Sequence, residues 1–171
     1  MSSRPARGTI AHPEFSFHDA EPEETGVSSL TLSRELRDTI VTYLQRCRPD
    51  EGVGLLAASS RGSTLVAVGF YPGRNIDSSP QRYTMNPADV VAALTDMRRR
   101  ETRLGAIVHS HPNTSPVPSR TDLAEANFPG VLSLIVGFSP QIELRAWSFG
   151  YDIHGDAVRC EEVPITSMIP K

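Results

Sequence analysis

Hydrophobic and polar positions along the chain follow the helical period in two places, the first of them near the N-terminal end. From residue 33 to residue 47 the apolar side chains recur every three or four positions, the spacing of one helix face. These side chains are Leu36, Ile40, Leu44 and Cys47. Ser33 precedes them as a candidate N-cap, and Pro49 follows them as a stop signal. The pattern predicts a helix over residues 33–47.

The second helical segment spans residues 86–100. Asn86 is a suitable N-cap, Pro87 suits the first helical position, and Asp89 lies in the first turn, where the helix dipole favours an acidic side chain. We expect the buried face of this helix to consist of Val90, Val91, Leu94 and Met97.

Elsewhere the chain contains short apolar runs of strand length. They lie at residues 28–32, 54–58, 64–71, 104–109, 131–138, 143–148 and 157–163. The second and third runs flank a polar turn and predict a hairpin. Because strands outnumber helices and the helices are inserted between them, we expect an α/β protein with one mixed sheet flanked by helices.

Residues 1–27 differ from the remainder of the chain. They contain three prolines and an acidic cluster, and their apolar residues are sparse. Phe15 and Phe17 alternate with polar neighbours, so a short added strand is an alternative to disorder. We expect a flexible N-terminal extension over residues 1–27 and a single domain over residues 28–171, a size that can bury its own core.

Composition and charge exclude several classes of protein. Hydrophobic residues make up 39% of the 171 residues and charged residues 22%, which is typical of a globular domain. Apolar runs fall far short of the roughly 20 residues of a membrane span, and a net charge of -3 argues against nucleic-acid binding. With two cysteines and no apolar leader segment, a cytoplasmic location is expected.

Candidate chemistry is concentrated after the strand at 104–109. His109 and His111 are two positions apart on an extended chain, so their side chains share one face. Asp122 follows at the start of a short helix that Ser119 begins. Two imidazoles and one carboxylate can bind zinc and leave a fourth position open, as in catalytic zinc sites. Ser119-X-X-Asp122 also has the spacing of a capping box, and both interpretations can hold together.

Hydrolysis at such a site requires a proton acceptor. Glu51 is the candidate, because it opens the strand that follows the first helix, and Gly54 permits close backbone approach nearby. In isolation an acidic residue after Pro49 and Asp50 is typical of a solvated turn. The motif that contains His109 favours the catalytic interpretation.

Taken together, Glu51, His109-X-His111 and Ser119-X-X-Asp122 resemble the signature of the JAMM/MPN+ zinc metallopeptidases, and in particular their compact prokaryotic branch. The resemblance implies a curved mixed sheet flanked by helices, related to cytidine deaminases. It implies that His109, His111 and Asp122 bind one Zn²⁺ per chain. It further implies that Glu51 is the general base for a zinc-activated water and that Ser119 donates a hydrogen bond to the oxyanion.

The same resemblance implies a substrate class. Members of the family cleave after the C-terminal Gly-Gly of ubiquitin-like proteins, so a deubiquitinase-like isopeptidase or peptidase is expected, acting on a ubiquitin-like modifier or a sulfur-carrier protein. Tyr83 is a candidate for the substrate groove, and Asn75 is a weaker point of similarity. Val53 stands where many prokaryotic relatives have cysteine, which weakens the sulfur-carrier assignment. The modifier, the linkage and the choice between monomer and homodimer stay open.

Three alternatives remain. One is a non-catalytic MPN-type binding scaffold, although such relatives typically lose metal ligands. Another is a JAB-domain protein of the DNA-repair-associated branch, which has a similar His-X-His-Pro loop. The third is a cupin-like metal protein that uses His109 and His111 with other ligands. The two predicted helices do not suit the small all-β barrel that this third alternative requires.

Overall fold

Within residues 26–125, 128, 130–151 and 158–167, which the computed structural model describes, the chain forms three helices and eight strands. The helices are α1 (Arg34–Cys47), α2 (Pro87–Arg99) and α3 (Arg120–Ala124). The strands are β1 (Ser29–Thr31), β2 (Val53–Arg61), β3 (Thr64–Gly73), β4 (Arg103–His111), β5 (Leu132–Gly137), β6 (Glu143–Tyr151), β7 (Val158–Val163) and β8 (Ile165–Thr166). Ser33 and Asn86 cap α1 and α2 as predicted.

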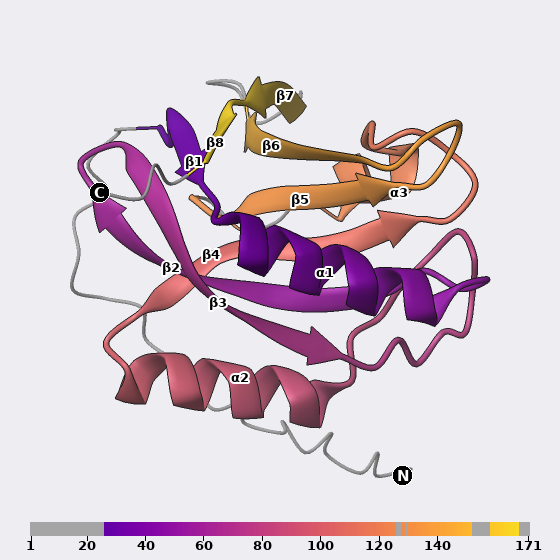
Figure 1. Ribbon diagram of the computed structural model, residues 1–171, viewed down its shortest axis with the longest axis horizontal. Coiled ribbons are helices and arrows are strands. Elements are labelled where there is room, and N and C mark those ends of the chain that lie inside the picture. The colour runs from indigo at the N-terminus through magenta and orange to yellow at the C-terminus, as the bar shows by residue number, and fades with distance from the viewer. Residues whose placement is uncertain (1–25, 126–127, 129, 152–157, 168–171) are drawn as a thin grey trace, which may run out of the picture.

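The strands form one mixed sheet in the order β7-β6-β5-β4-β2-β3-β1-β8 (Figure 1). Strand β4 is parallel to β5, and β1 is parallel to both β3 and β8, whereas the other neighbours are antiparallel. The prediction of an α/β protein with a mixed sheet is confirmed. The two-residue strand β8 was not predicted, because two residues are too short to show a period.

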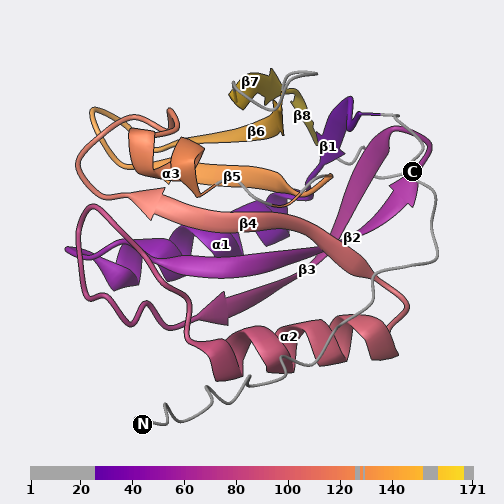
Figure 2. The same ribbon diagram turned by 180° about the vertical axis from the view of Figure 1, so that it is seen from behind.

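The helices α1 and α2 pack on opposite faces of the sheet. Ile40 and Leu44 of α1 pack in one buried cluster with Leu56 of β2, whereas α2 contributes to a second cluster that includes Leu55. Alternate residues of a strand point to opposite faces, so the two clusters lie on the two sides of the sheet. Figure 2, from behind, shows α3 in front of the sheet and α1 behind it.

The buried face of α2 differs from the predicted one. Ala93 and Met97 are buried against the sheet, while Val91 is 64% exposed and Leu94 is 42% exposed. The prediction is therefore wrong for Val91 and Leu94. The apolar arc of this helix is wide, and the small Ala93 side chain allows the backbone of α2 to approach the sheet on one part of that arc only.

Most of the predicted N-terminal extension, including Phe15 and Phe17, lies outside the described residues. The boundary between residues 27 and 28 therefore stays a prediction. Cys160 of β7 is exposed, and it forms no disulfide. Among the described helices, none combines the length and the apolar character that a membrane span needs.

Candidate metal centre

The end of β4 supplies the two histidines of the centre. This strand lies between β2 and β5, and His109 is in register with Val53 on one side and with Ile135 on the other. His109 and His111 project from the same face, with ring centroids 5.2 Å apart. His109 is fully buried and His111 is 6% exposed. The alternation of a strand therefore delivers both imidazoles to one place, as predicted.

A capping box brings the carboxylate of Asp122 to the centre. The hydroxyl of Ser119 accepts a hydrogen bond from the backbone N–H of Asp122 at 3.1 Å, and the carboxylate of Asp122 accepts one from the Ser119 N–H at 2.6 Å. These reciprocal bonds begin α3 and fix the rotamer of Asp122. Both interpretations of the Ser-X-X-Asp spacing are therefore compatible with the geometry.

The loop between His111 and Ser119 is held against β5 and β6. Nε1 of Trp147 donates a hydrogen bond to the carbonyl oxygen of Pro116 at 2.9 Å. A side chain at Gly137 would place its Cβ 2.6 Å from Pro116, so the close approach of the loop requires glycine there. These contacts set the direction in which the chain returns to α3.

The ligand atoms of His109, His111 and Asp122 all lie within 4.8 Å of one another. Nε2 of His109 lies 3.1 Å from Oδ1 of Asp122, and Nε2 of His111 lies 3.3 Å from Oδ2. With bonds of about 2.0–2.1 Å to one tetrahedral zinc ion, two ligand atoms are about 3.4 Å apart. The separations therefore fit a shared metal ion.

The hydrogen bonds of the two imidazoles also fit a metal site. In the described part of the chain, the buried side-chain nitrogen and oxygen atoms that lack a hydrogen-bond partner are Nδ1 and Nε2 of His109. Its 3.1 Å approach to Asp122 is short, but it lacks hydrogen-bond geometry, and a buried nitrogen without a partner is costly. Nδ1 of His111 lies 3.0 Å from the Ser115 carbonyl, which leaves Nε2 free to bind a metal.

Burial and charge shift the pKa values of these groups in different directions. Burial lowers the pKa of His109 and so favours the neutral imidazole that a metal requires. Burial alone would raise the pKa of Asp122, but the imidazoles of His109 and His111 close to its carboxylate hold that pKa well below its usual range. Burial would lower the pKa of His111, whereas the nearby carboxylate of Asp122 and the carbonyl oxygen of Ser115 give a net rise. Asp122 is therefore ionised at neutral pH.

Glu51 lies beside the three candidate ligand residues, two positions before the start of β2. Its side chain is buried, with 6% of its surface exposed. Burial raises the pKa of Glu51 to about 7; nearby His111 opposes this shift and Asp122 adds to it. A carboxyl group with this pKa can both accept and release a proton near neutral pH.

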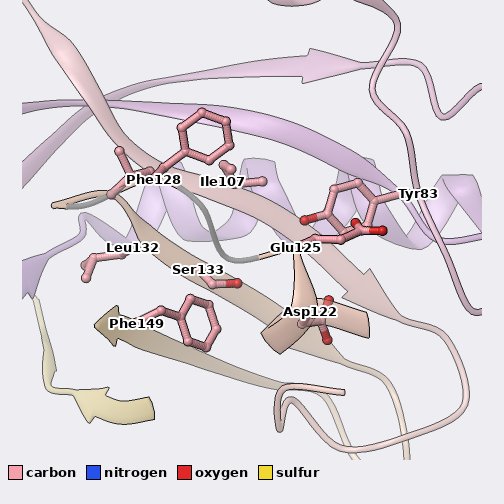
Figure 3. A pocket seen from close by; sticks show the side chains of 9 residues that line it. Tyr83, Ile107, Asp122, Glu125, Phe128, Leu132, Ser133 and Phe149 are labelled. Atoms are coloured by element: carbon pink, nitrogen blue, oxygen red, sulfur yellow. The ribbon is translucent and has the colours of Figure 1, made fainter. Parts of the chain in front are cut away.

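An apolar pocket of about 40 Å³ adjoins the centre at Asp122 (Figure 3). Its lining includes Tyr83, Ile107, Phe128, Leu132 and Phe149. The ring of Tyr83 also packs against His109, with 4.7 Å between the centroids. Burial raises the pKa of Tyr83, and the carboxylates of Asp122, Glu125 and Glu51 add to this rise, so its hydroxyl stays protonated. The expectation that Tyr83 lines a groove near the site agrees with this placement.

The structure brings together His109, His111 and Asp122 and places Glu51 and Ser119 next to them. Val53 is fully buried against α2 and Met85, so its side chain faces the core. Sequence reasoning did not identify the contact of Trp147 with Pro116, since these residues are 31 positions apart. It also gave no role to Ser110, which hydrogen-bonds Gly52 across two strands.

A mixed sheet in which a His-X-His strand end meets a Ser-X-X-Asp helix start defines the class of JAB-like α/β domains. A family model described as prokaryotic homologs of the JAB domain matches residues 33–150. The chain therefore belongs to this family.

Curated relatives and solved structures are similar over most of the chain. The desampylase of Haloferax volcanii is 29% identical over 126 residues, which are 71% of this chain and 89% of that protein. The CysO-cysteine peptidase of Mycobacterium tuberculosis is 28% identical over 110 residues, 63% of this chain and 72% of that protein. A solution structure from Desulfitobacterium hafniense has a TM-score of 0.69 and 25% identity, covering 82% of this chain and 94% of that one. A solution structure from Salinibacter ruber has a TM-score of 0.55 and 21% identity, covering 80% of this chain and 90% of that one, and it shares the fold.

Proposed function

We propose that this chain is a zinc-dependent peptidase or isopeptidase that cleaves after the C-terminal Gly-Gly of a ubiquitin-like modifier or a sulfur-carrier protein. The observation that carries the proposal is the convergence of His109, His111 and Asp122 beside the buried Glu51. The names of the two relatives, desampylase and CysO-cysteine peptidase, support a polypeptide of this kind as the substrate.

In this proposal His109, His111 and Asp122 hold one zinc ion per chain. Two neutral imidazoles and one carboxylate form the donor set of a catalytic zinc site with an open position. When bound, zinc acts as a Lewis acid that brings the pKa of water to about 7. The unpartnered Nε2 of His109 and the ionised Asp122 both support this assignment.

Glu51 acts as the general base and then as the proton donor to the leaving amine. Its pKa of about 7 suits both steps, because the group is partly ionised at neutral pH. Ser119 donates a hydrogen bond to the carbonyl oxygen as negative charge develops there. Its oxygen accepts the Asp122 N–H, so the hydroxyl hydrogen remains free to donate.

The pocket beside Asp122 offers a mostly apolar surface to the substrate. Its walls combine aromatic and aliphatic side chains with the polar side chains of Asp122, Glu125 and Ser133. A cavity of about 40 Å³ has room for roughly three waters, which is the size of a small apolar side chain. We therefore place the chain of the substrate that adjoins the scissile bond along this pocket.

Elemental analysis of the purified protein tests the metal part of the proposal. We expect about one zinc per chain in the wild type, loss of that zinc in His109→Ala, and full zinc content in Glu51→Gln, which removes no ligand. If the wild type holds no zinc after zinc is supplied and the excess is dialysed away, the chain is a binding scaffold and the proposal is wrong.

A further inference from the structure

Hydrogen bonds hold all four backbone polar groups of Glu51 and Gly52. The Glu51 N–H donates to the carbonyl oxygen of Ser79 at 2.8 Å, and the Glu51 carbonyl accepts from Nδ2 of Asn75 at 3.0 Å. The Gly52 N–H donates to Oγ of Ser110 at 2.8 Å, and the Gly52 carbonyl accepts from the Ser110 N–H at 3.1 Å. Two of these four bonds come from side chains.

Ser110 reaches Gly52 from the strand that carries the histidines. It stands between His109 and His111, and its side chain points to the opposite face of β4. Ser110 is fully buried, so no water competes with its hydroxyl for the Gly52 N–H. Removing this acceptor would leave a buried N–H unsatisfied, which destabilises the segment. The segment containing Glu51 is thereby tied to β4.

Asn75 holds the same segment from the other side. Its Nδ2 donates to the carbonyl oxygens of Glu51 and Arg82, the latter at 3.1 Å, and its Oδ1 accepts from the N–H groups of Asp77 and Thr84 at 3.0 and 3.1 Å. One amide therefore folds the loop between β3 and α2 and fastens it to Glu51. A serine or threonine hydroxyl has a single hydrogen, so it could not donate to both carbonyl oxygens.

We propose that Ser110 and Asn75 are positioning residues that aim the carboxylate of Glu51 at the metal centre. The inference rests on the proposed function, in which Glu51 is the general base. Proton transfer requires the base to stay within hydrogen-bond reach of the reacting group, and a displacement of about 1 Å costs on the order of 10²-fold in rate. Ser110 and Asn75 prevent such a displacement by fixing the backbone on both sides of the Glu51 side chain.

Amide hydrogen exchange in the zinc-loaded protein tests whether Ser110 anchors the backbone next to Glu51, whatever the activity is. In Ser110→Ala, we expect the Gly52 amide to exchange about tenfold faster, because it loses its acceptor. Trp147→Phe is the matched control: it removes one side-chain hydrogen bond, to Pro116, on the other side of the centre, and should leave Gly52 protection unchanged. Equal protection of Gly52 in Ser110→Ala and wild type would overturn the inference.

A kinetic cycle on a Gly-Gly-linked ubiquitin-like substrate separates positioning from general stability. Ser110→Ala and Asn75→Asp should each lower kcat about tenfold, with KM within about twofold of the wild-type value. In a Glu51→Gln background, the same two changes should lower the residual kcat by less than about twofold. Equal losses in both backgrounds would overturn the inference. Asn75→Asp keeps both acceptor bonds and loses both donor bonds.

Two further variants complete this test. Ser110→Thr retains a hydroxyl and should restore most of kcat. Thr84→Ala removes the Thr84–Asp77 side-chain bond in the same loop without touching Glu51, and kcat should stay within about twofold of the wild type. If the wild type cleaves nothing, the proposed function fails, and hydrogen exchange at Gly52 still decides the role of Ser110.

Discussion

Two buried carboxyl groups at the centre differ in the charge that surrounds them, and this difference separates their roles. The imidazoles of His109 and His111 keep Asp122 ionised, which suits a metal ligand. Burial dominates at Glu51 and raises its pKa to about 7, which suits a proton carrier. Two titratable groups whose environments push their pKa values apart are a common basis for acid–base assignment.

The raised pKa of Glu51 predicts how the stability of the metal-free protein depends on pH. Folding raises the pKa of Glu51 from its ordinary value of 4.5 to about 7, so the folded protein holds this proton more tightly than the unfolded chain does. The contribution of Glu51 to stability is therefore full below pH 4.5 and is lost as the pH rises through 7. Between pH 4.5 and 8, the unfolding free energy of the wild type should fall relative to Glu51→Gln by up to about 3 kcal/mol. Denaturant unfolding of both proteins measures this difference, and parallel pH profiles would contradict it.

Glu51→Gln also predicts a kinetic result. The amide preserves the shape and the hydrogen-bonded backbone but cannot accept a proton, so kcat should fall by about 10²–10⁴-fold with zinc content unchanged. Steady-state cleavage and elemental analysis on the same preparation measure both quantities. Full turnover in this variant would remove Glu51 from the mechanism.

At the residue scale, close spacing determined what the sequence could predict. His109, His111, Ser119 and Asp122 lie within one strand end, one loop and one helix start, so local periodicity and capping rules apply to them. The bond between Ser110 and Gly52 joins residues 58 positions apart, and strand register alone creates it. The resemblance pointed to Asn75 without giving it a role.

At the scale of elements, the loop after β4 positions α3 against the sheet. The Trp147–Pro116 hydrogen bond and the close approach at Gly137 hold this loop over β5 and β6. Nearly all element positions followed from the period of the sequence, because long strands and capped helices carry strong local signals. The period did not predict which face of α2 is buried. The apolar side chains cover a wide arc of this helix, and only one part of that arc packs against the sheet.

Gly137→Ala tests the role of this loop. Its new Cβ would lie 2.6 Å from Pro116, so the loop must shift and move Asp122 away from the histidines. We expect a loss of about 1–3 kcal/mol in unfolding free energy and weaker zinc binding by about tenfold or more. Gly150→Ala is the control, since a Cβ there meets no atom within 4 Å. Equal zinc affinity in the two variants would contradict this role of the loop.

At the scale of the whole molecule, the centre links parts of the chain that are distant in sequence. Glu51 precedes β2, the histidines end β4, and Asp122 lies in α3, so the proposed metal ligands and base assemble only when the sheet has formed. A metal that binds the folded chain and not the unfolded one stabilises the fold by mass action.

Zinc should therefore raise the thermal stability of the chelator-treated protein. Free zinc at about 100 times its Kd adds about 2.7 kcal/mol to the free energy of unfolding, and calorimetry will detect this as a higher Tm. Asp122→Ala removes one ligand and should lose most of the rise. An equal rise in wild type and Asp122→Ala would assign the effect to zinc bound elsewhere.

Cleavage of a defined Gly-Gly substrate tests the central claim most directly. A ubiquitin-like domain is joined through its C-terminal Gly-Gly to the ε-amine of a reporter lysine, or is extended by a single cysteine, and intact mass spectrometry identifies the products. We predict release after Gly-Gly by the zinc-loaded wild type on at least one substrate, loss of release after chelation, recovery with zinc, and release by Glu51→Gln that is slower by about 10²-fold or more. A wild type that binds one zinc per chain and leaves both substrates intact would contradict the account.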